Sequence, residues 1–470
     1  MLREETRPVS PKETDRYAIE FEAFHARFAR FFARREPRET ARRYLRGLLA
    51  AVERKNCWQM AEAVGDANPQ PLQRLLYSAP WDVDAVRDEL QRFVIERFGA
   101  EDAIAVVDET GFLKKGTKSV GVKRQYCGTA GKIENCQVGV FLTYYSSGGY
   151  TFLDRRLYLP QEWCNDGERR QEAKVPEEVI FQTKAQLALQ MLEHAWAQGV
   201  PMTWVTADEI YGDDTQVRDA VAGAGKRYVF AVAAGTAVWR ERPALVAPTQ
   251  GKTGRPRTKL RLADGAPQWE AVAGVVATLP ERAWKRFAVG QGEKGPRLYD
   301  WARVRIVERR RPLPGPQGWL LARRSMADPT EIAYYLSNAP HSTSLRALAE
   351  VAAARWSIET TFEESKGEAG LDEYEVRYWH SWHRHITLSM LAHAWLASVR
   401  QGTGEKSAGS PTGRGKRARS APVAGNRFAA ATTYIRTAAG LVALATSQAA
   451  AGSPQPLSAQ RCSLARTWHP

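Results

Sequence analysis

Apolar residues recur every three or four positions through residues 1–100, a spacing that predicts helices. Arginines occupy the face opposite the clearest apolar stripe. That stripe comprises Ala41, Tyr44, Leu45, Leu48, Leu49 and Val52. A short helix over 58–64, a turn with Gly, Asp, Asn and Pro, and a helix over 71–78 are expected next. This order is typical of a helix-turn-helix reader of DNA, with Gln73 and Arg74 pointing outward, although many small helical bundles share it.

After residue 100 the pattern changes to short apolar runs, which predict strands. Gly199 lies just past an expected helix and is suited to cap its C-terminus. The expected elements are strands over 103–108, 137–144 and 150–159, a helix over 177–198, a strand over 202–208, a helix over 215–222 and a strand over 227–232. Three strands, a helix and a further strand is the element order of an RNase H-like core.

The rest of the chain changes character twice. Residues 233–339 hold Pro and Gly clusters and short alternating runs, which predict a mostly β insertion with a basic loop over 251–259. Residues 340–400 return to helical spacing. Residues 401–470 are rich in Ala, Gly and Ser, with nine Lys or Arg against one acid. We therefore expect a basic, disordered tail, or else an unrelated, frameshifted C-terminus.

The predicted fold class is therefore α/β. A chain of 470 residues is too long for a single core, which agrees with a division into parts. The expected parts are a helical DNA-binding domain over 1–100, the first part of an RNase H-like catalytic core over 101–232, a β-rich insertion over 233–339, the C-terminal helices of the core over 340–400 and the tail over 401–470.

Charge, cysteine content and hydrophobicity limit the classes of protein to which this sequence can belong. The formal charge is +15, a surplus that favours a polyanion such as DNA, although a merely soluble basic protein has the same balance. Five scattered cysteines without a C-x-x-C pair argue against a disulfide framework or a zinc ribbon. A charged N-terminus and the lack of a long apolar run predict neither signal peptide nor membrane span, and hence a cytoplasmic protein.

Two aspartates, Asp108 and Asp208, close apolar runs that are expected to be strands. Such strand ends can lie side by side in a sheet. Glu109 and Glu209 follow directly, and because adjacent residues of a strand point to opposite faces, we expect them to point away. Carboxylates on separate elements can hold two Mg²⁺ or Mn²⁺ ions for phosphodiester cleavage, and strand-end capping is the alternative.

A third carboxylate, Glu359, lies on an expected helix together with Arg355 and Lys366. Their spacing places all three on one stripe, so the glutamate can reach a metal ion while the two cations grip neighbouring phosphates. Glu363, one turn further on, competes for the ligand role. An ordinary ion pair between Arg355 and Glu359 is the alternative.

Basic residues also crowd the stretch after the first aspartate. They are Lys114, Lys115, Lys118, Lys123 and Arg124. We expect them to steer phosphates beside the metal ions, and a solvated hairpin is the alternative.

The stretch 355–366 resembles the Y-(2)-R-(3)-E-(6)-K signature of DDE transposases from bacterial insertion sequences, with Ala352 at the tyrosine position. The similarity covers about residues 20–400. Three further segments resemble motifs of one branch, insertion-sequence family seven hundred and one: 108–116, 128–140 and 206–212.

This resemblance implies that Asp108, Asp208 and Glu359 form a metal triad. It implies that Arg355 and Lys366 contact DNA near the scissile phosphate. Transposition of this type normally pairs two DNA ends, so the resemblance also implies a homodimer on DNA.

The β insertion between the second aspartate and the glutamate also fits that family. In related enzymes such an insertion can hold a displaced base by stacking on tryptophan. Trp319 and Trp301 are the candidates here, and core packing is the alternative.

We therefore hypothesise a transposase, associated with the bacterial nucleoid, that binds the terminal inverted repeats of its element, cleaves there and transfers the strand to target DNA. Two rivals stay open. A catalytically inactive DNA-binding protein, decayed or domesticated, is favoured by Ala352 and the atypical tail. A host nuclease with the same core is the other, and inverted repeats flanking the gene would argue against it.

Overall fold

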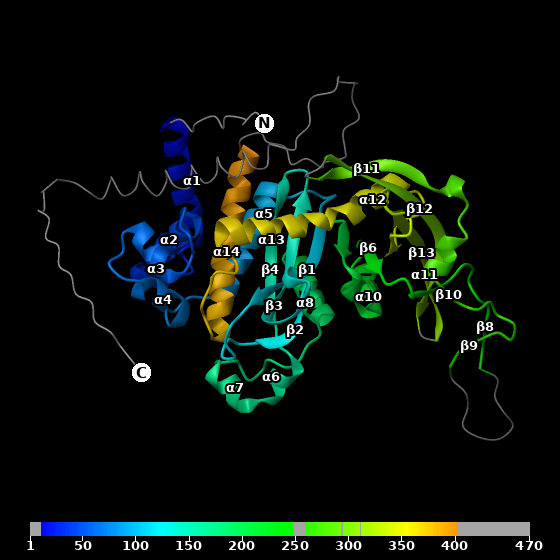
Figure 1. The fold of residues 1–470 in the computed structure, drawn as a ribbon, viewed down its shortest axis with the longest axis horizontal. Coiled ribbons are helices and arrows are strands. Elements are labelled where there is room, and N and C mark those ends of the chain that lie inside the picture. The colour runs from blue at the N-terminus through cyan, green and yellow to red at the C-terminus, as the bar shows by residue number, and fades with distance from the viewer. Residues whose placement is uncertain (1–10, 249–258, 293–294, 311, 403–470) are drawn as a thin grey trace, which may run out of the picture.

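The structure, a computed structural model, is described for residues 11–248, 259–292, 295–310 and 312–402. Within these residues the chain is mixed α/β, with one large sheet flanked by helices (Figure 1). Most of the expected basic loop over 251–259 and nearly all of the expected tail over 401–470 lie outside the described residues.

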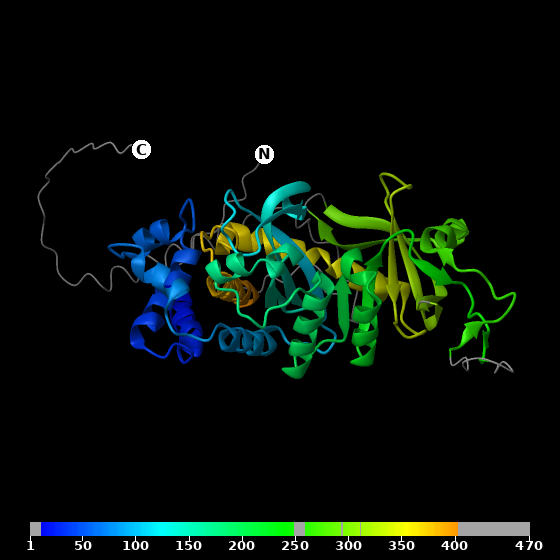
Figure 2. The ribbon, with the colours of Figure 1, turned by 90° about the horizontal axis from the view of Figure 1, so that it is seen from below.

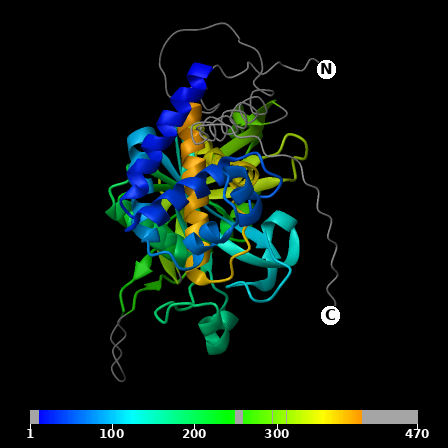
Figure 3. The same cartoon turned by 90° about the vertical axis from the view of Figure 1, so that its left-hand side faces the viewer.

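Helices precede the sheet, in the segment where the helical spacing predicts them. They are α1 (Pro11–Ala29), α2 (Arg35–Leu49), α3 (Cys57–Val64), α4 (Gln70–Tyr77) and α5 (Val83–Phe98). The side chain of Asn56 accepts hydrogen bonds from two backbone N–H groups at the start of α3, and Gly65, with φ +79°, ends this helix. α2 and α4 pack on α14 (Trp379–Gly402), which lies between them and the sheet (Figures 1 and 3).

The central part of the sheet combines antiparallel and parallel pairing, with neighbours in the order β4-β3-β1-β5-β6. β3 pairs antiparallel with β1 and with β4, whereas β1, β5 and β6 run parallel. These strands, with β2 on the far side of β3, are β1 (Ile104–Leu113), β2 (Lys123–Cys127), β3 (Lys132–Ser146), β4 (Gly149–Tyr158), β5 (Trp204–Ala207) and β6 (Arg227–Val232).

Helices connect the parallel strands on one side of the sheet (Figure 2). The protruding α6 (Gln161–Asn165) and α7 (Gly167–Glu172) follow β4, and then come α8 (Lys184–Ala197), α9 (Glu209–Gly212) and α10 (Thr215–Gly223). The expectation of a helix from residue 177 is wrong at its start. Thr183 caps α8 in a reciprocal capping box with Gln186, which fixes the first turn at Lys184.

The insertion is mostly β, as the alternating runs predict. Its elements are β7 (Ala237–Trp239), β8 (Leu245–Val246), β9 (Arg261–Leu262), β10 (Glu270–Ala271), α11 (Val272–Ala277), η2 (Glu281–Ala283), β11 (Lys285–Gly292), β12 (Gly295–Arg310), β13 (Leu313–Arg324) and β14 (Ile332–Ser337). β14 pairs with β6, so most of these strands extend the central sheet, which has 12 strands in the described part of the chain. Only β8 and β9 form a separate pair there.

Two helices return from the insertion to the central strands. α12 (Leu345–Ala354) covers β5 and β6, and α13 (Trp356–Ala369) crosses β1 and β4 on the sheet face opposite α8 and α10 (Figures 1 and 2). The helical spacing after residue 340 corresponds here to two helices, which are divided at Arg355. This residue is at once the C-cap of α12 and the N-cap of α13.

None of the helices in the described ranges combines the length and the hydrophobicity that a bilayer crossing requires.

Candidate active site

The two aspartates of the predicted site meet because β1 and β5 are in register. Their parallel pairing runs from Ile104 opposite Trp204 to Val107 opposite Ala207, so Asp108 and Asp208 are the next residues on each strand. Asp208 begins α9, where its side chain accepts a hydrogen bond of 3.0 Å from the backbone N–H of Ile210. The expectation that both residues end strands holds only for Asp208, since β1 continues to Leu113 along β3.

Glu109 completes a group of three carboxylates. One oxygen from each of Asp108, Glu109 and Asp208 lies within 4.8 Å of the others. The expectation that Glu109 points away is therefore wrong. Because β5 ends at Ala207, the edge of β1 is open at this point, and the long glutamate side chain can reach it from the other sheet face.

Lys184 and Tyr211 hold the third carboxylate in place. The Nζ of Lys184 lies 2.6 Å from one oxygen of Glu109, and the hydroxyl of Tyr211 donates to the other. Neither residue stands out in the sequence. The Lys184 contact joins α8 to β1, and the spacing of residues within either element does not predict it.

The three carboxylates carry like charges, which repel one another. Burial, together with the nearby charge of Asp208, raises the pKa of Asp108 to about 7. Burial and the charge of Glu109 raise the pKa of Asp208 to about 6. Hard carboxylate oxygens that repel one another at this distance suit a divalent cation such as Mg²⁺ or Mn²⁺, which offsets their charge.

Arg355 links the group to the predicted third ligand. Its Nη1 lies 3.2 Å from Oδ2 of Asp108, and its Nη2 lies 2.8 Å from Oε1 of Glu359. The side chain of Glu359, in the first turn of α13, is 48% exposed and lies beside the carboxylates without joining the compact group. Glu363, the competitor one turn on, is also exposed.

The sequence profile of a family described as DDE superfamily endonuclease matches residues 27–296, more than half of the chain. The chain belongs to this family. The resemblance drawn from the sequence motifs is thereby confirmed. The matched part contains Asp108 and Asp208 and ends before α13, so the assignment of Glu359 depends on the geometry of the site.

The chain is 31% identical over 168 residues to the "Probable transposase for insertion sequence element IS701" of Microchaete diplosiphon, over 36% of this chain and 41% of the relative. The matched stretch thus spans less than half of that relative. The cryo-EM structure of the piggyBac transposase synaptic complex with hairpin DNA aligns with a TM-score of 0.37 at 9% identity, over 97% of this chain and 77% of the other.

Lys366 lies beside β1, the strand that carries Asp108. Its Nζ donates to the hydroxyl of Thr110 at 2.8 Å and to that of Thr129 at 3.1 Å. Thr110 is two residues past Asp108 on β1, so both side chains project from the same side of the strand. Sequence reasoning missed Thr110 and Thr129, although both lie in motifs that it quoted.

The cations after the first aspartate divide into two kinds. The Nζ of Lys114 turns inward, donates 3.0 Å to the carbonyl of Tyr374 and lies 3.6 Å from the centre of that ring. Burial lowers its pKa to about 8. A role for Lys114 in steering phosphates is therefore wrong for this geometry, whereas Lys115 and Arg124 are exposed.

The predicted DNA contacts on α4 lie in the group of N-terminal helices (Figure 1). Arg74 is exposed and its guanidinium lies 4.0 Å from Glu36, while Gln73 is half-buried. Both side chains are therefore at least partly accessible to solvent on α4.

The tryptophans proposed for base stacking are buried. Trp319 is 6% exposed, and the guanidinium carbons of Arg303 and Arg305 lie 4.1 Å and 4.7 Å from its ring centre. Trp301 is fully buried against Phe287. A base could reach neither ring without displacing these neighbours, so the stacking expectation is wrong for this arrangement and the core-packing alternative fits.

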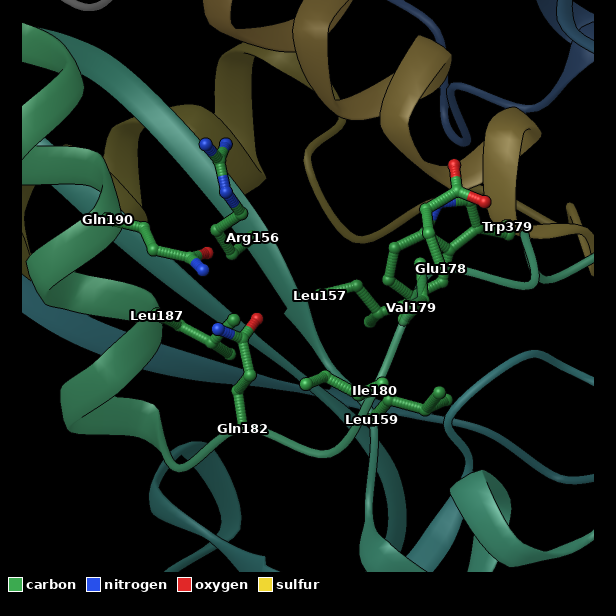
Figure 4. A pocket seen from close by; sticks show the side chains of 10 residues that line it. All are labelled: Arg156, Leu157, Leu159, Glu178, Val179, Ile180, Gln182, Leu187, Gln190 and Trp379. Carbon is green, nitrogen blue, oxygen red and sulfur yellow. The ribbon is translucent and has the colours of Figure 1, made fainter.

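A cavity of about 370 Å³ lies elsewhere, between β4, α8 and the segment before α8 (Figure 4). Leu157, Leu187 and Trp379 line it together with polar side chains such as Arg156 and Gln190. None of the three grouped carboxylates lines this cavity, so it is separate from the candidate active site.

Proposed function

We propose that this endonuclease is the transposase of a bacterial insertion sequence. It would bind the terminal inverted repeats of its element, cleave the DNA there and join the freed 3′-hydroxyl to target DNA. The observation that carries the proposal is the in-register pair Asp108 and Asp208, linked through Arg355 to Glu359 on a crossing helix. The name of the relative from Microchaete diplosiphon supports the same activity.

The strands around the site support an RNase H-like core. An antiparallel β4-β3-β1 unit followed by parallel β5 and β6 is the arrangement expected from the order of three strands, a helix and further strands. We assign the core to 101–232 and 340–400, interrupted by the insertion over 233–339. The proposed DNA-reading domain is 1–100, in which α3, the turn at Gly65 and α4 would present Gln73 and Arg74 to the end sequence.

Asp108, Asp208 and Glu359 are the proposed holders of two Mg²⁺ or Mn²⁺ ions, with Glu109 as a fourth carboxylate in reach. When bound, such ions supply Lewis-acid activation of the attacking water or 3′-hydroxyl and stabilise the leaving oxygen. The side chains orient this chemistry. The backbone N–H of Ile210 fixes Asp208, and Lys184 with Tyr211 fixes Glu109.

The cations of the site would bind the DNA strand. Lys366 offers its ammonium beside Thr110, and Arg355, whose two Nη atoms pair with Asp108 and Glu359, would turn them to a phosphate. The exposed Lys115 and Arg124 would add phosphate contacts further out. Because transposition joins two ends, a homodimer on DNA completes the proposal.

Strand cleavage tests the proposal directly. The substrate is duplex DNA carrying the sequence ends that flank this gene, with Mg²⁺ or Mn²⁺ added. We expect cutting at the ends by the wild type and none above background by Asp108→Asn, Asp208→Asn or Glu359→Gln. Glu363→Gln, an exposed glutamate one turn away, is the matched control and should retain cutting. Loss in Glu363→Gln with full activity in Glu359→Gln would transfer the ligand role to Glu363.

One observation favours an inactive DNA-binding protein instead. Ala352, at the tyrosine position of the signature, is 4% exposed and fills a place in the core of α12. If the wild type binds its flanking ends but cuts none of them, while Ala352→Tyr regains cutting, the copy is decayed. Absence of repeated ends around the gene would favour a host nuclease.

A further inference from the structure

Lys366 is held in a different way from the other cations near the carboxylates. Arg355 is paired with Asp108 and Glu359, and Lys184 is paired with Glu109. Within the described ranges, no carboxylate lies within ion-pair distance of the Lys366 ammonium. Its charge therefore stays available to an anion.

Two threonine hydroxyls, which we call the hydroxyl cradle, hold this ammonium. Thr110 lies on β1 and is almost completely buried. Thr129 lies in the turn η1 (Gly128–Ala130) between β2 and β3. Its hydroxyl donates a hydrogen bond of 3.3 Å to the backbone carbonyl of Gly111 and lies 3.3 Å from the hydroxyl of Thr110. The turn is thus folded back onto the catalytic strand.

The geometry leaves the ammonium one free donor. An ammonium has three N–H groups, and the two cradle hydroxyls accept from two of them. The ring of Phe112 lies 5.9 Å away on one side. Thr110 lies two residues past Asp108, which corresponds to roughly 6.6 Å along β1, so the ammonium is bonded to a residue close to the first aspartate. A neutral acceptor fixes the position of a cation without cancelling its charge.

We propose that Thr110 and Thr129 are positioning residues that hold Lys366 for a phosphate of the DNA strand being cut. The inference rests on the proposed function, because that function supplies the strand. It goes beyond it by giving the β2–β3 turn a part in the site: the turn places Thr129, and Thr129 helps to aim the lysine. Neither threonine touches the reacting atoms.

The test measures binding of a fluorescein-labelled duplex with the ends that flank this gene, in EDTA, across a range of salt concentrations. The variants are Lys366→Ala, the double change Thr110→Val with Thr129→Val, and the double change of both threonines to Ser. Valine keeps the shape and removes the hydroxyl, whereas serine keeps the hydroxyl. Thr203→Val, which removes a remote hydroxyl bonded to the carbonyl of Glu101, is the matched control.

We expect Lys366→Ala to reduce the slope of log affinity against log salt by about 0.9, the value for one lost phosphate contact. The double valine variant should bind about threefold to tenfold more weakly, as loss of one or two modest hydrogen bonds predicts. The double serine variant and Thr203→Val should match the wild type. In a Lys366→Ala background, the valine changes should have no further effect. Thermal unfolding of each variant checks that all are folded.

The inference is overturned if the double valine variant binds like the wild type while Lys366→Ala is weakened. It is also overturned if the valine changes weaken binding equally with and without Lys366. Failure of the proposed recognition of DNA ends looks different, because the wild type would then not bind the duplex and Lys366→Ala would equal it. That result would remove the basis of the inference as well.

Discussion

The two ends of α13 hold their cations by opposite means. At its start, Arg355 is shared between the carboxylates of Asp108 and Glu359. Near its end, Lys366 rests on the hydroxyls of Thr110 and Thr129. Both ends face β1. The charge of Arg355 is neutralised by paired carboxylates, whereas Lys366 is held by neutral hydroxyl groups. The arginine therefore balances the acidic group, while the lysine contributes net positive charge for a polyanion.

The first and largest prediction separates the two ends by their effect on cleavage. Asp108→Asn should lower the rate of strand cutting by about 1,000-fold, equivalent to about 4 kcal/mol, because the carboxylates hold the ions. Lys366→Ala should lower it by only about tenfold, since one phosphate contact is lost. Single-turnover cleavage measures both. Equal losses would break the comparison and place Lys366 among the catalytic residues.

The second prediction compares the two cations in stability. Arg355→Ala leaves Asp108 and Glu359 without their paired cation beside the other carboxylates, so the free energy of unfolding should fall by about 2 kcal/mol at neutral pH. Lys366→Ala should change it by no more than about 0.5 kcal/mol, because no described carboxylate is within ion-pair distance of that charge. Urea unfolding in EDTA measures both. A larger loss for Lys366→Ala would contradict the view that its charge is uncompensated.

The third prediction uses the pKa of Asp208, which burial and Glu109 raise to about 6. A carboxyl group with a raised folded-state pKa stabilises fully below its unfolded pKa of about 3.9, and that stability is lost as the pH rises through about 6. Asn at this position keeps the helix cap and cannot ionise. Asp208→Asn should therefore be about 1–2 kcal/mol more stable than the metal-free wild type above about pH 7 and no more stable near pH 4.

Added Mn²⁺ should reverse that order, because ions bound to the folded wild type stabilise it and the variant lacks a ligand. Thermal unfolding with and without Mn²⁺ at the two pH values gives the answer. If Mn²⁺ stabilises Asp208→Asn as much as the wild type, Asp208 is not a ligand.

The fourth and smallest prediction disturbs the lysine end alone. A Cβ on Gly111 would lie 2.3 Å from the Sγ of Cys127, which is buried beside the turn that carries Thr129. Gly111→Ala should displace this turn, cost about 1 kcal/mol of stability and weaken DNA binding about twofold to threefold. Gly128→Ala, where a Cβ meets open space, is the matched control and should behave like the wild type. DNA binding is measured with the same fluorescein-labelled duplex, and stability by thermal unfolding.

Much of the central sheet could be predicted from sequence because its strands are buried on both faces. The runs that become β1, β5 and β6 are continuous and apolar, and the predicted strand over 227–232 coincides with β6. The apolar pattern does not reveal β2, because this strand contains no apolar run and begins with two basic residues. Local spacing also could not reveal that β14 pairs with β6, since register between distant strands is not encoded in either strand alone.

The site was predictable where identity and spacing suffice. Asp108 and Asp208 were found because strand, carboxylate and family motif coincide. Glu109 was rejected by pleating alone, which takes no account of the open edge left by the short β5. The sequence shows Lys114 only as one of a run of cations, and its contact with Tyr374, 260 residues away, turns it inward.

By itself the sequence determined the family, the α/β class and the two aspartates, because each of these follows from the residue types of a motif or from the local spacing of apolar positions. Only the tertiary structure decided that Glu109 joins the two aspartates, that Arg355 pairs with Asp108, and that Thr129 on a distant turn supports Lys366. The physical reason is that charge and hydrogen bonding act through space. Which groups meet is therefore settled by strand register and helix crossing, and not by the residues adjacent in the chain.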